Sequence, residues 1–193
     1  MSQKLILDAS FHLLLQQIDQ EIASDALKQG CPHPGCKGKL HRADYPRSPM
    51  GLSPDFRDLY DLRISFCCSI CRRRTTTVTV RFFGRRWYPA PLFILLSLLT
   101  LGINQRRLTQ VKRHFGFVAS ESTWRRWRGW WRTIFVQTPF WQQEKGRAPP
   151  TSELNRGPFP RVLLNPLKGK FKEKIPLLLH FLAPLTAGNL RAV

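Results

Sequence analysis

Two pairs of cysteines are the residues of this sequence whose type and spacing best suit a defined chemistry. Four residues separate Cys31 from Cys36, two separate Cys68 from Cys71, and 31 residues lie between the pairs. Both spacings let a tight turn aim two thiolates at one point, so two such turns can supply the four sulfur ligands of a tetrahedral zinc ion, at about 2.3 Å from the metal. Because the protein then fills every coordination position, we expect a structural Zn²⁺ and no metal-bound water.

The exact ligand set is open at this point. Cys67 directly precedes Cys68, and neighbouring side chains of a strand point to opposite faces, so only one of the two can easily meet the metal. We favour Cys68, because its two-residue gap to Cys71 makes the tighter turn. His33 or His41 is an alternative ligand in place of one sulfur, and buried free thiols are the alternative to any metal site.

An arginine- and tryptophan-rich stretch over residues 122–132 is the second candidate site. At about 100° per residue, a helix places its apolar residues on one stripe, which we expect to be core. The residues of this stripe are Trp124, Trp127, Trp131, Ile134 and Phe135. Arg125, Arg128 and Arg132 flank the stripe, and Arg126 points elsewhere. This pattern is typical of a DNA recognition helix, and a solvated basic face would share it.

The residues before this stretch resemble the first half of a helix-turn-helix. We expect a helix over 107–115 that is closed by Gly116, and a following helix that begins near Ser120 or Ser122, since serine is a good N-cap. The turn between them is about two residues longer than the common form, so base contacts are not assigned singly. The predicted nucleic-acid-binding residues are Arg106, Arg107, Lys112, Arg113, Thr123, Arg125, Arg126, Arg128 and Arg132.

The charge of the chain favours a polyanionic partner. There are 31 Lys and Arg against 12 Asp and Glu, a formal charge of +19. Residues 1–61 hold seven basic and eight acidic residues, whereas the remainder holds 24 basic and four acidic ones. Such asymmetry suits phosphate backbones or anionic membranes. The longest apolar run, 92–103, is shorter than the ~20 residues of a membrane span, so we expect a buried helix, no membrane contact, and DNA as the partner.

The start of the sequence does not have the pattern of a secretory signal, because Asp8 interrupts the apolar region 5–15. We therefore expect a cytoplasmic, nucleoid-associated protein. In a reducing compartment, clustered cysteines hold a metal more often than they form disulfides. The oligomeric state does not follow from any of these patterns.

The elements that must position both sites follow from hydrophobic periodicity. Residues 4–28 predict an amphipathic helix with Asp19 on its exposed side. Its predicted buried residues are Leu7, Phe11, Leu14, Ile18 and Ile22. Alternating and β-branched residues predict strands over 62–66 and 75–83, on either side of the second cysteine pair. Further helices are expected over 92–101 and 175–182.

The predicted fold class is α+β: a zinc ribbon of short antiparallel strands, followed by an all-α, helix-turn-helix-like domain. The expected divisions are an N-terminal helix over 1–29, the ribbon over 30–86, the DNA-binding domain over 87–144, and a Pro-rich linker with a C-terminal helix over 145–193.

An enzymatic role is not expected. Nucleases and transposases of the two-metal kind need clustered carboxylates, and the basic part of the chain has only four acids over some 130 positions. Asp55, Asp58 and Asp61 are better suited to capping a turn. The sequence contains neither a Gly-rich phosphate loop nor a nucleophilic Ser flanked by glycines.

Several segments together resemble a known group of proteins. They are the two cysteine turns, 31–36 and 68–76, the stretches 40–47 and 81–87, the Arg/Trp-rich helix and the ending 179–186. The chain resembles small bacterial proteins of uncharacterised type that accompany insertion sequences and combine a zinc ribbon with a helix-turn-helix. The resemblance implies a mobile-element DNA-binding accessory or regulator associated with a transposase, or a transposase-like DNA-binding module.

A protein-interaction module is the alternative function. Such a module would dock on a transposase or another partner and would bind DNA or RNA without sequence preference. Exposed tryptophans would favour single strands, since bases stack on aromatic rings, whereas buried tryptophans would favour duplex DNA.

Overall fold

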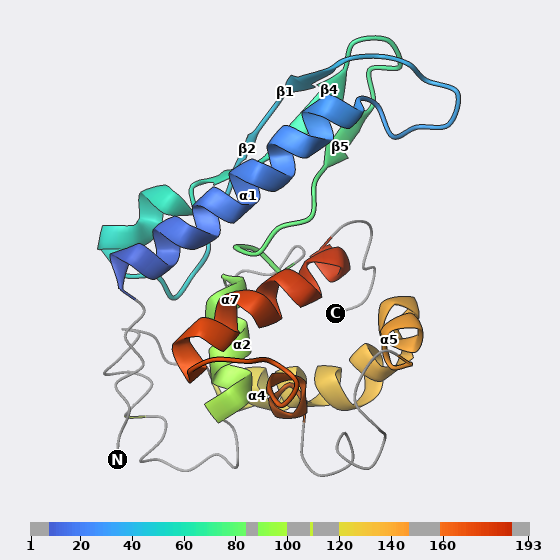
Figure 1. Cartoon of the computed structure of the whole chain (residues 1–193). Coiled ribbons are helices and arrows are strands. Elements are labelled where there is room, and N and C mark those ends of the chain that lie inside the picture. The colour runs from blue at the N-terminus through green and yellow to red at the C-terminus, as the bar shows by residue number, and fades with distance from the viewer. Residues whose placement is uncertain (1–7, 84–88, 100–108, 110–119, 147–158, 187–193) are drawn as a thin grey trace.

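The computed structural model describes residues 8–83, 89–99, 109, 120–146 and 159–186. These residues form a mixed α+β fold. A long helix, α1, lies along a small antiparallel sheet, and the helices α2, α4, α5 and α7 gather on the other side of the molecule (Figure 1). We call the sheet with its cysteine turns (residues 30–76) the ribbon, and the helices from α2 onward the helical body.

Helix α1 spans Ala9–Gln29, close to the predicted range. Asp8 caps it by accepting a hydrogen bond from the Phe11 amide at 3.0 Å, and Gly30 ends it with a φ of 78°, a conformation that suits glycine. The predicted residues 4–7 lie outside the described part of the chain. The helix contributes Phe11 and Leu15 to the core of the helical body and Ala23 to the small core of the ribbon, so it packs on both regions.

The predicted apolar face of α1 was wrong in part. The buried residues are Phe11, His12, Leu15, Asp19 and Ala23. Leu14, predicted to be buried, is 44% exposed, and Asp19, predicted to be exposed, is 1% exposed. The physical reason is that both buried polar groups have partners: His12 bonds to Tyr60, and Asp19 to Arg81. Burial of a polar group costs little when its hydrogen bonds are made.

The ribbon contains five short strands in two sheets. Strand β4 (Ser65–Cys68) lies between β1 (Leu40–Arg42) and β5 (Arg74–Thr76), and β2 (Tyr45–Pro46) pairs with β3 (Leu62–Arg63); all pairs are antiparallel. A 3₁₀ helix, Pro54–Leu59, lies in the connection from β2 to β3. Leu40, Ile64 and Phe66 form a small core with Ala23 of α1 and Cys68.

The strand predicted over 75–83 is shorter than expected, because β5 ends at Thr76. The amides of residues 79–81 are bonded to side chains and not to a neighbouring strand. The Thr79 amide donates to the Thr186 hydroxyl at 2.8 Å, and the Val80 amide donates to the Asp19 carboxylate at 2.8 Å. This segment therefore joins α1 to the end of the helical body.

The helical body is built around aromatic side chains. Its elements are α2 (Ala90–Leu99), α4 (Glu121–Gly129), a π-helical turn (Trp130–Ile134), a 3₁₀ turn (Phe135–Gln137), α5 (Pro139–Glu144), a second 3₁₀ turn (Arg161–Leu164), and α7 (Phe171–Leu182), which ends in a third (Ala183–Thr186). The predicted tryptophan stripe is confirmed as core: Trp124 and Trp131 are 1% exposed and Phe135 is fully buried. The predicted helix over 175–182 is confirmed and begins earlier, at Phe171.

Within the described ranges, no helix combines the length and the apolar character that crossing a bilayer requires. Helix α2, which holds most of the longest apolar run, has 10 residues and packs in the core through Leu92, Phe93 and Ile94.

Candidate metal centre

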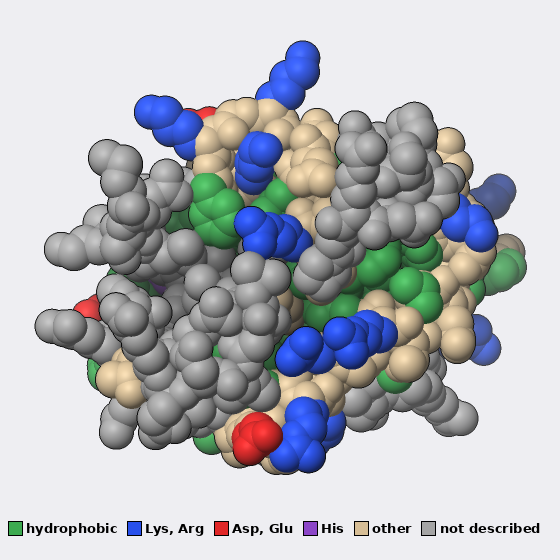
Figure 2. Space-filling view, turned by 90° about the horizontal axis from the view of Figure 1, so that it is seen from below, with side chains coloured by type: hydrophobic (Ala, Val, Ile, Leu, Met, Phe, Trp, Pro, Cys, Tyr) green, Lys and Arg blue, Asp and Glu red, His purple; other side chains and the backbone are tan. Residues whose placement is uncertain are grey.

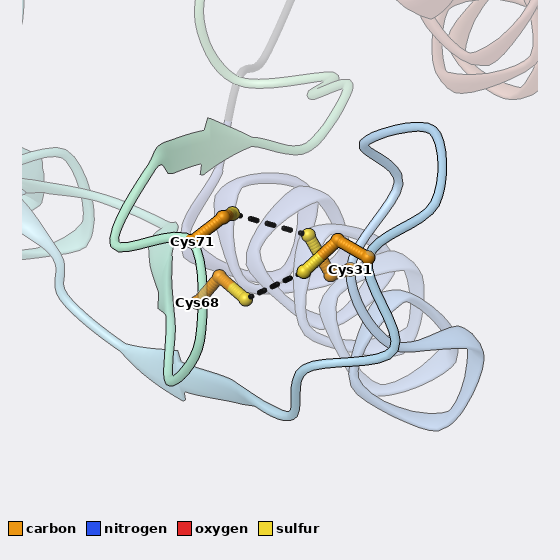
Figure 3. A group of neighbouring side chains, drawn as sticks. Cys31, Cys68 and Cys71 are labelled. Carbon is orange, nitrogen blue, oxygen red and sulfur yellow. Dashed lines mark hydrogen bonds between the residues drawn. The ribbon is translucent and has the colours of Figure 1, made fainter.

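The four predicted cysteine ligands meet at one end of the ribbon. The thiol sulfurs of Cys31, Cys36, Cys68 and Cys71 all lie within 4.8 Å of one another. The Sγ atoms of Cys31 and Cys71 are 3.7 Å apart, and those of Cys36 and Cys68 are 3.5 Å apart. Figure 3 shows the thiols of the two turns pointing toward one another, with no disulfide between them.

Each turn is held by its own backbone hydrogen bonds. In the first, which directly follows α1, the Cys31 amide donates to Gly38 at 3.1 Å and the Cys36 amide to His33 at 3.0 Å. In the second, the Cys68 amide donates to Arg73 at 3.1 Å, which closes the hairpin between β4 and β5. A helix end and a hairpin thus position one pair of thiols each.

The two turns are also bonded to each other. The Ser69 amide donates to the Lys39 carbonyl at 2.9 Å, and the Lys39 amide donates to the Ser69 hydroxyl at 3.1 Å. Gly38 permits this approach, because a Cβ there would lie 2.3 Å from the Cys68 sulfur. Only glycine, which has no Cβ, fits at such a distance. Any other residue at position 38 would push the first turn away from the Cys68 sulfur.

The structure places Cys68, and not Cys67, in the group of four. The Cys67 sulfur lies 3.5 Å from the carbonyl of Arg72 and belongs to the opposite face of β4, as strand alternation requires. His41 is opposite Cys67 in the β1–β4 register, so it shares that face. His33 lies in the first turn, but it does not belong to the group of converging ligand atoms found among the described residues.

The donor set fits a thiolate-bound metal ion. A tetrahedron with metal–sulfur distances of about 2.3 Å places its sulfurs about 3.8 Å apart. The two sulfur pairs given above come within a few tenths of an ångström of that value. Soft thiolates select zinc or other thiophilic metals over magnesium or calcium. These four cysteines can therefore hold one metal ion and leave no position for a bound water.

The thiols differ in how readily they release a proton. Burial opposes ionisation of Cys68, but the amides of Cys71 and Ile70 and the neighbouring thiols lower its pKa to about 6. The His33 amide favours the thiolate of Cys31, but burial and the three other thiols raise the pKa of Cys31 to about 12. A metal ion would replace the protons that the closely spaced sulfurs otherwise share.

The predicted nucleic-acid contacts divide into two groups. Arg106, Arg107, Lys112 and Arg113, on or just before the first helix of the expected helix-turn-helix, lie outside the described residues. The others lie on or just after α4: Thr123, Arg125, Arg126, Arg128 and Arg132. Ser120 is the N-cap, as predicted, and accepts from the Thr123 amide at 3.3 Å.

The side chains of α4 differ in accessibility. Arg125, Arg126 and Arg132 are exposed and Arg128 is half-buried. Arg125 donates to Glu121 at 2.9 Å, one turn earlier. Thr123 is only 5% exposed, and its hydroxyl bonds to Ser120 and Arg126, so it supports the helix start and is turned away from solvent.

Sequence reasoning missed a buried polar network. The Asp19 carboxylate accepts from Arg81 Nε at 2.8 Å and from the Thr79 hydroxyl at 2.5 Å, in addition to the Val80 amide. Arg81 also donates to the carbonyl of Leu59. The signal was present in the spacing, since Phe11, Leu15, Asp19 and Ala23 follow one another at four-residue intervals on a single face of α1.

The chain matches no protein-family model, no curated protein and no solved structure.

Proposed function

We propose that the protein binds duplex DNA through α4 and holds a structural zinc ion with Cys31, Cys36, Cys68 and Cys71. The observation that carries the DNA proposal is the division of α4 into two sides. Trp124 and Trp127 are buried in the helical body, whereas Arg125 and Arg126 are exposed. Recognition helices combine an anchored apolar side with guanidinium groups that can reach phosphates or base edges.

The surface around α4 supports a polyanionic partner. Figure 2 views the molecule from below Figure 1, the side on which α4 lies, and Lys and Arg side chains are spread over this face with few acidic ones. Ser120, the N-cap of α4, is also exposed, and the helix dipole favours a phosphate group at this end of the helix. Phosphate contacts would fix the orientation of the helix, and a few arginines would provide sequence preference.

Burial of the tryptophans favours a duplex over a single strand. The five tryptophans in the described residues, Trp124, Trp127, Trp130, Trp131 and Trp141, are all at most 6% exposed. Proteins that bind single strands stack the bases on exposed aromatic rings. Trp127 and Trp131 pack on Phe93, and Trp130 packs on Trp131. Because all five rings are buried, they are not accessible to bases.

The metal has a structural role in this proposal. Four thiolates fill a tetrahedral shell, so the ion would fix the two turns and would not activate water. The further assignment as a mobile-element accessory or regulator is based on the sequence resemblance alone. Identification of a transposase as the partner would test it.

A protein-interaction module is the second candidate function. The exposed leucines of α1 favour it, since Leu13 is 52% and Leu27 is 43% exposed. In that case the basic surface would bind nucleic acid without sequence preference, and the specific partner would be a transposase or another protein.

The test is selection from a random-duplex library at near-physiological salt with zinc-loaded protein. We expect enrichment of one motif. Arg125→Ala and Arg132→Ala should each weaken binding. Each lost phosphate contact should also make the negative slope of log K against log salt less steep by about 0.9. Arg57→Ala removes the same charge from an exposed position on the 3₁₀ helix before β3 and serves as the control.

Two outcomes would count against the proposal. Salt-dependent retention without an enriched motif would favour the interaction module with a non-specific basic surface. Absence of any duplex retention at low salt would refute DNA binding altogether.

A further inference from the structure

The second cysteine turn holds an arginine in an unfavourable backbone conformation. Arg72 has a φ of 57°, and it is the one non-glycine residue with positive φ in the described part of the chain. This left-handed region strains any residue with a Cβ, whereas glycine adopts it freely. Arg72 directly follows Cys71 and closes the hairpin to β5, where a glycine would be the relaxed choice. A strained position that keeps a long cationic side chain is a reason to look for a role of that side chain.

Arg72 belongs to a group of basic residues that we call the ribbon-tip cluster: Lys37, Lys39, Arg72 and Arg73. All four are exposed. The two cysteine turns bring these residues together. Lys39 in the first turn exchanges two hydrogen bonds with Ser69 in the second, and the backbone carbonyl of Arg73 accepts from the Cys68 amide. Arg74 differs, because its guanidinium donates to the carbonyl of Ala43 at 3.1 Å and to the Ser65 hydroxyl at 3.3 Å.

Acidic residues do not offset this cluster. Neither residues 26–43 nor residues 62–83 contain an Asp or Glu. In the described ranges, none of the four ribbon-tip residues forms an ion pair. A divalent ion with four thiolates carries a charge of about −2, which would balance part of the cluster and leave an excess of positive charge at the tip.

The ribbon-tip cluster is separate from α4. In Figure 1 the β1–β4–β5 sheet and its loops lie at the top of the molecule, and α4 lies at the bottom, with α7 and α2 between them. A short duplex seated on α4 would thus leave the ribbon tip free for another stretch of nucleic acid.

We propose that Lys37, Lys39, Arg72 and Arg73 form a second contact surface for the phosphates of duplex DNA, so that one molecule can hold two duplex segments. This inference rests on the proposed function, because it assigns the same partner to a second surface. Guanidinium groups bind phosphate oxygens in a bidentate manner, and lysines add point charges along the backbone. The surface offers no hydrogen-bond acceptor from an acidic side chain, so it suits backbone contacts better than base readout.

The decisive variant is Arg72→Gly combined with Arg73→Ala. Glycine adopts the positive φ at residue 72 without strain. The variant should therefore bind metal as tightly as the wild type and have a thermal unfolding midpoint at least as high. A loss of DNA contact then cannot come from misfolding. Arg57→Ala is again the control for charge, and Arg125→Ala with Arg132→Ala removes contacts from α4.

Two measurements separate the surfaces. The first is retention of a single labelled duplex, and the second is capture of that duplex by zinc-loaded protein on a bead-bound duplex. We expect the wild type to capture, and the ribbon-tip variant to retain single duplex on α4 but to lose most of the capture. Between 50 and 200 mM salt, the affinity that drives capture should fall by a factor about ten times smaller for this variant than for the wild type, because two phosphate contacts are lost. The α4 variant should lose sequence-specific retention.

The outcomes are distinguishable. If the wild type retains a duplex but the ribbon-tip variant captures equally well and with the same salt dependence, this inference fails and the proposed function stands. If both variants weaken retention of one duplex and nothing is captured, the two surfaces form a single interface and the second segment is refuted. If the wild type retains no duplex, the proposed function fails, and this inference fails with it.

Discussion

Different interactions stabilise the ribbon and the helical body. The ribbon core contains Ala23, Leu40, Ile64, Phe66 and Cys68, and its strands have two to four residues. The helical body buries five tryptophans, together with phenylalanines and leucines that include residues of α2 and α7. So few apolar side chains offset only part of the conformational entropy lost when the ribbon is ordered. A metal ion bound to the four thiolates would supply further stability, as in other small metal-bound folds.

The two regions meet at a buried ion pair and not at a broad apolar surface alone. Asp19 on α1 and Arg81, after the ribbon, are both nearly inaccessible to solvent. Because every oxygen of the Asp19 carboxylate is hydrogen-bonded, this pair fixes how the ribbon is attached to the helices.

Metal removal should have the largest effect, and it should be confined to the ribbon. With a zinc chelator under reducing conditions, amides of residues 31–76 should lose hydrogen-exchange protection, since a structural zinc contributes on the order of 10 kcal/mol in small domains. Amides of α4 and α7 should keep theirs, and tryptophan emission should not change. Simultaneous loss of protection in both regions would show that the helical body depends on the metal.

Asp19→Ala should destabilise the metal-loaded protein by about 3–5 kcal/mol, because it leaves the buried Arg81 guanidinium without its anionic partner. The measurement is denaturant unfolding followed by tryptophan fluorescence. Asp25→Ala is the matched control, since the exposed Asp25–Lys28 pair on the same helix contributes less than about 1 kcal/mol. Equal effects of the two substitutions would contradict the role of the junction.

Acid should weaken the contact between α1 and the 3₁₀ helix of the ribbon. Burial lowers the pKa of His12 from 6.5 to about 4, and its Nδ1 lies 2.8 Å from the Tyr60 hydroxyl. Burial also raises the pKa of Tyr60, so both groups are neutral and share one hydrogen bond. Between pH 6.5 and 4 the unfolded chain binds a proton that the folded chain does not, so stability falls as the pH falls through this window, by at most about 3 kcal/mol.

The check is the difference in unfolding free energy between the wild type and His12→Gln from pH 7 to pH 4. Glutamine keeps an acceptor but has no titrating group, so the variant should lack this part of the pH dependence. Parallel pH profiles for the two proteins would show that His12 does not titrate in this range.

Gly38→Ala should weaken metal binding without unfolding the helical body. The added Cβ would meet the Cys68 sulfur, and a shifted ligand commonly lowers metal affinity 10- to 100-fold, about 1.4–2.7 kcal/mol. Competition with a chelator of known affinity measures this change. Gly129→Ala on α4 is the control, because a Cβ there meets nothing within 4 Å. Equal metal affinity for the two variants would mean that the turns have room to move apart.

Local patterns in the sequence predicted the candidate site well. The cysteine spacing placed all four sulfurs, because each pair depends only on one tight turn. Strand alternation allowed only one of Cys67 and Cys68 to face the metal, and the two-residue gap to Cys71 favoured Cys68. The N-cap at Ser120 and the tryptophan stripe of α4 also depend on neighbouring residues alone.

Features set by distant partners could not be predicted in the same way. The buried face of α1 depends on Arg81 and Tyr60, 62 and 48 residues away, respectively, from Asp19 and His12. The strand expected over 75–83 ends early because Asp19 and Thr186 take the amides that a neighbouring strand would have bonded. Apart from residue 109, the predicted helix over 107–115 lies outside the described residues, so the helix-turn-helix remains a prediction, as do the domain boundaries.

The most direct test of the metal-held ribbon is native mass spectrometry of protein purified under reducing conditions without added metal. We expect one zinc ion per chain, with a mass that shows the loss of protons from the coordinating thiols, and a Cys71→Ser variant that binds zinc weakly or not at all. A wild-type chain that is folded and metal-free, with four free thiols, would contradict a metal-held ribbon.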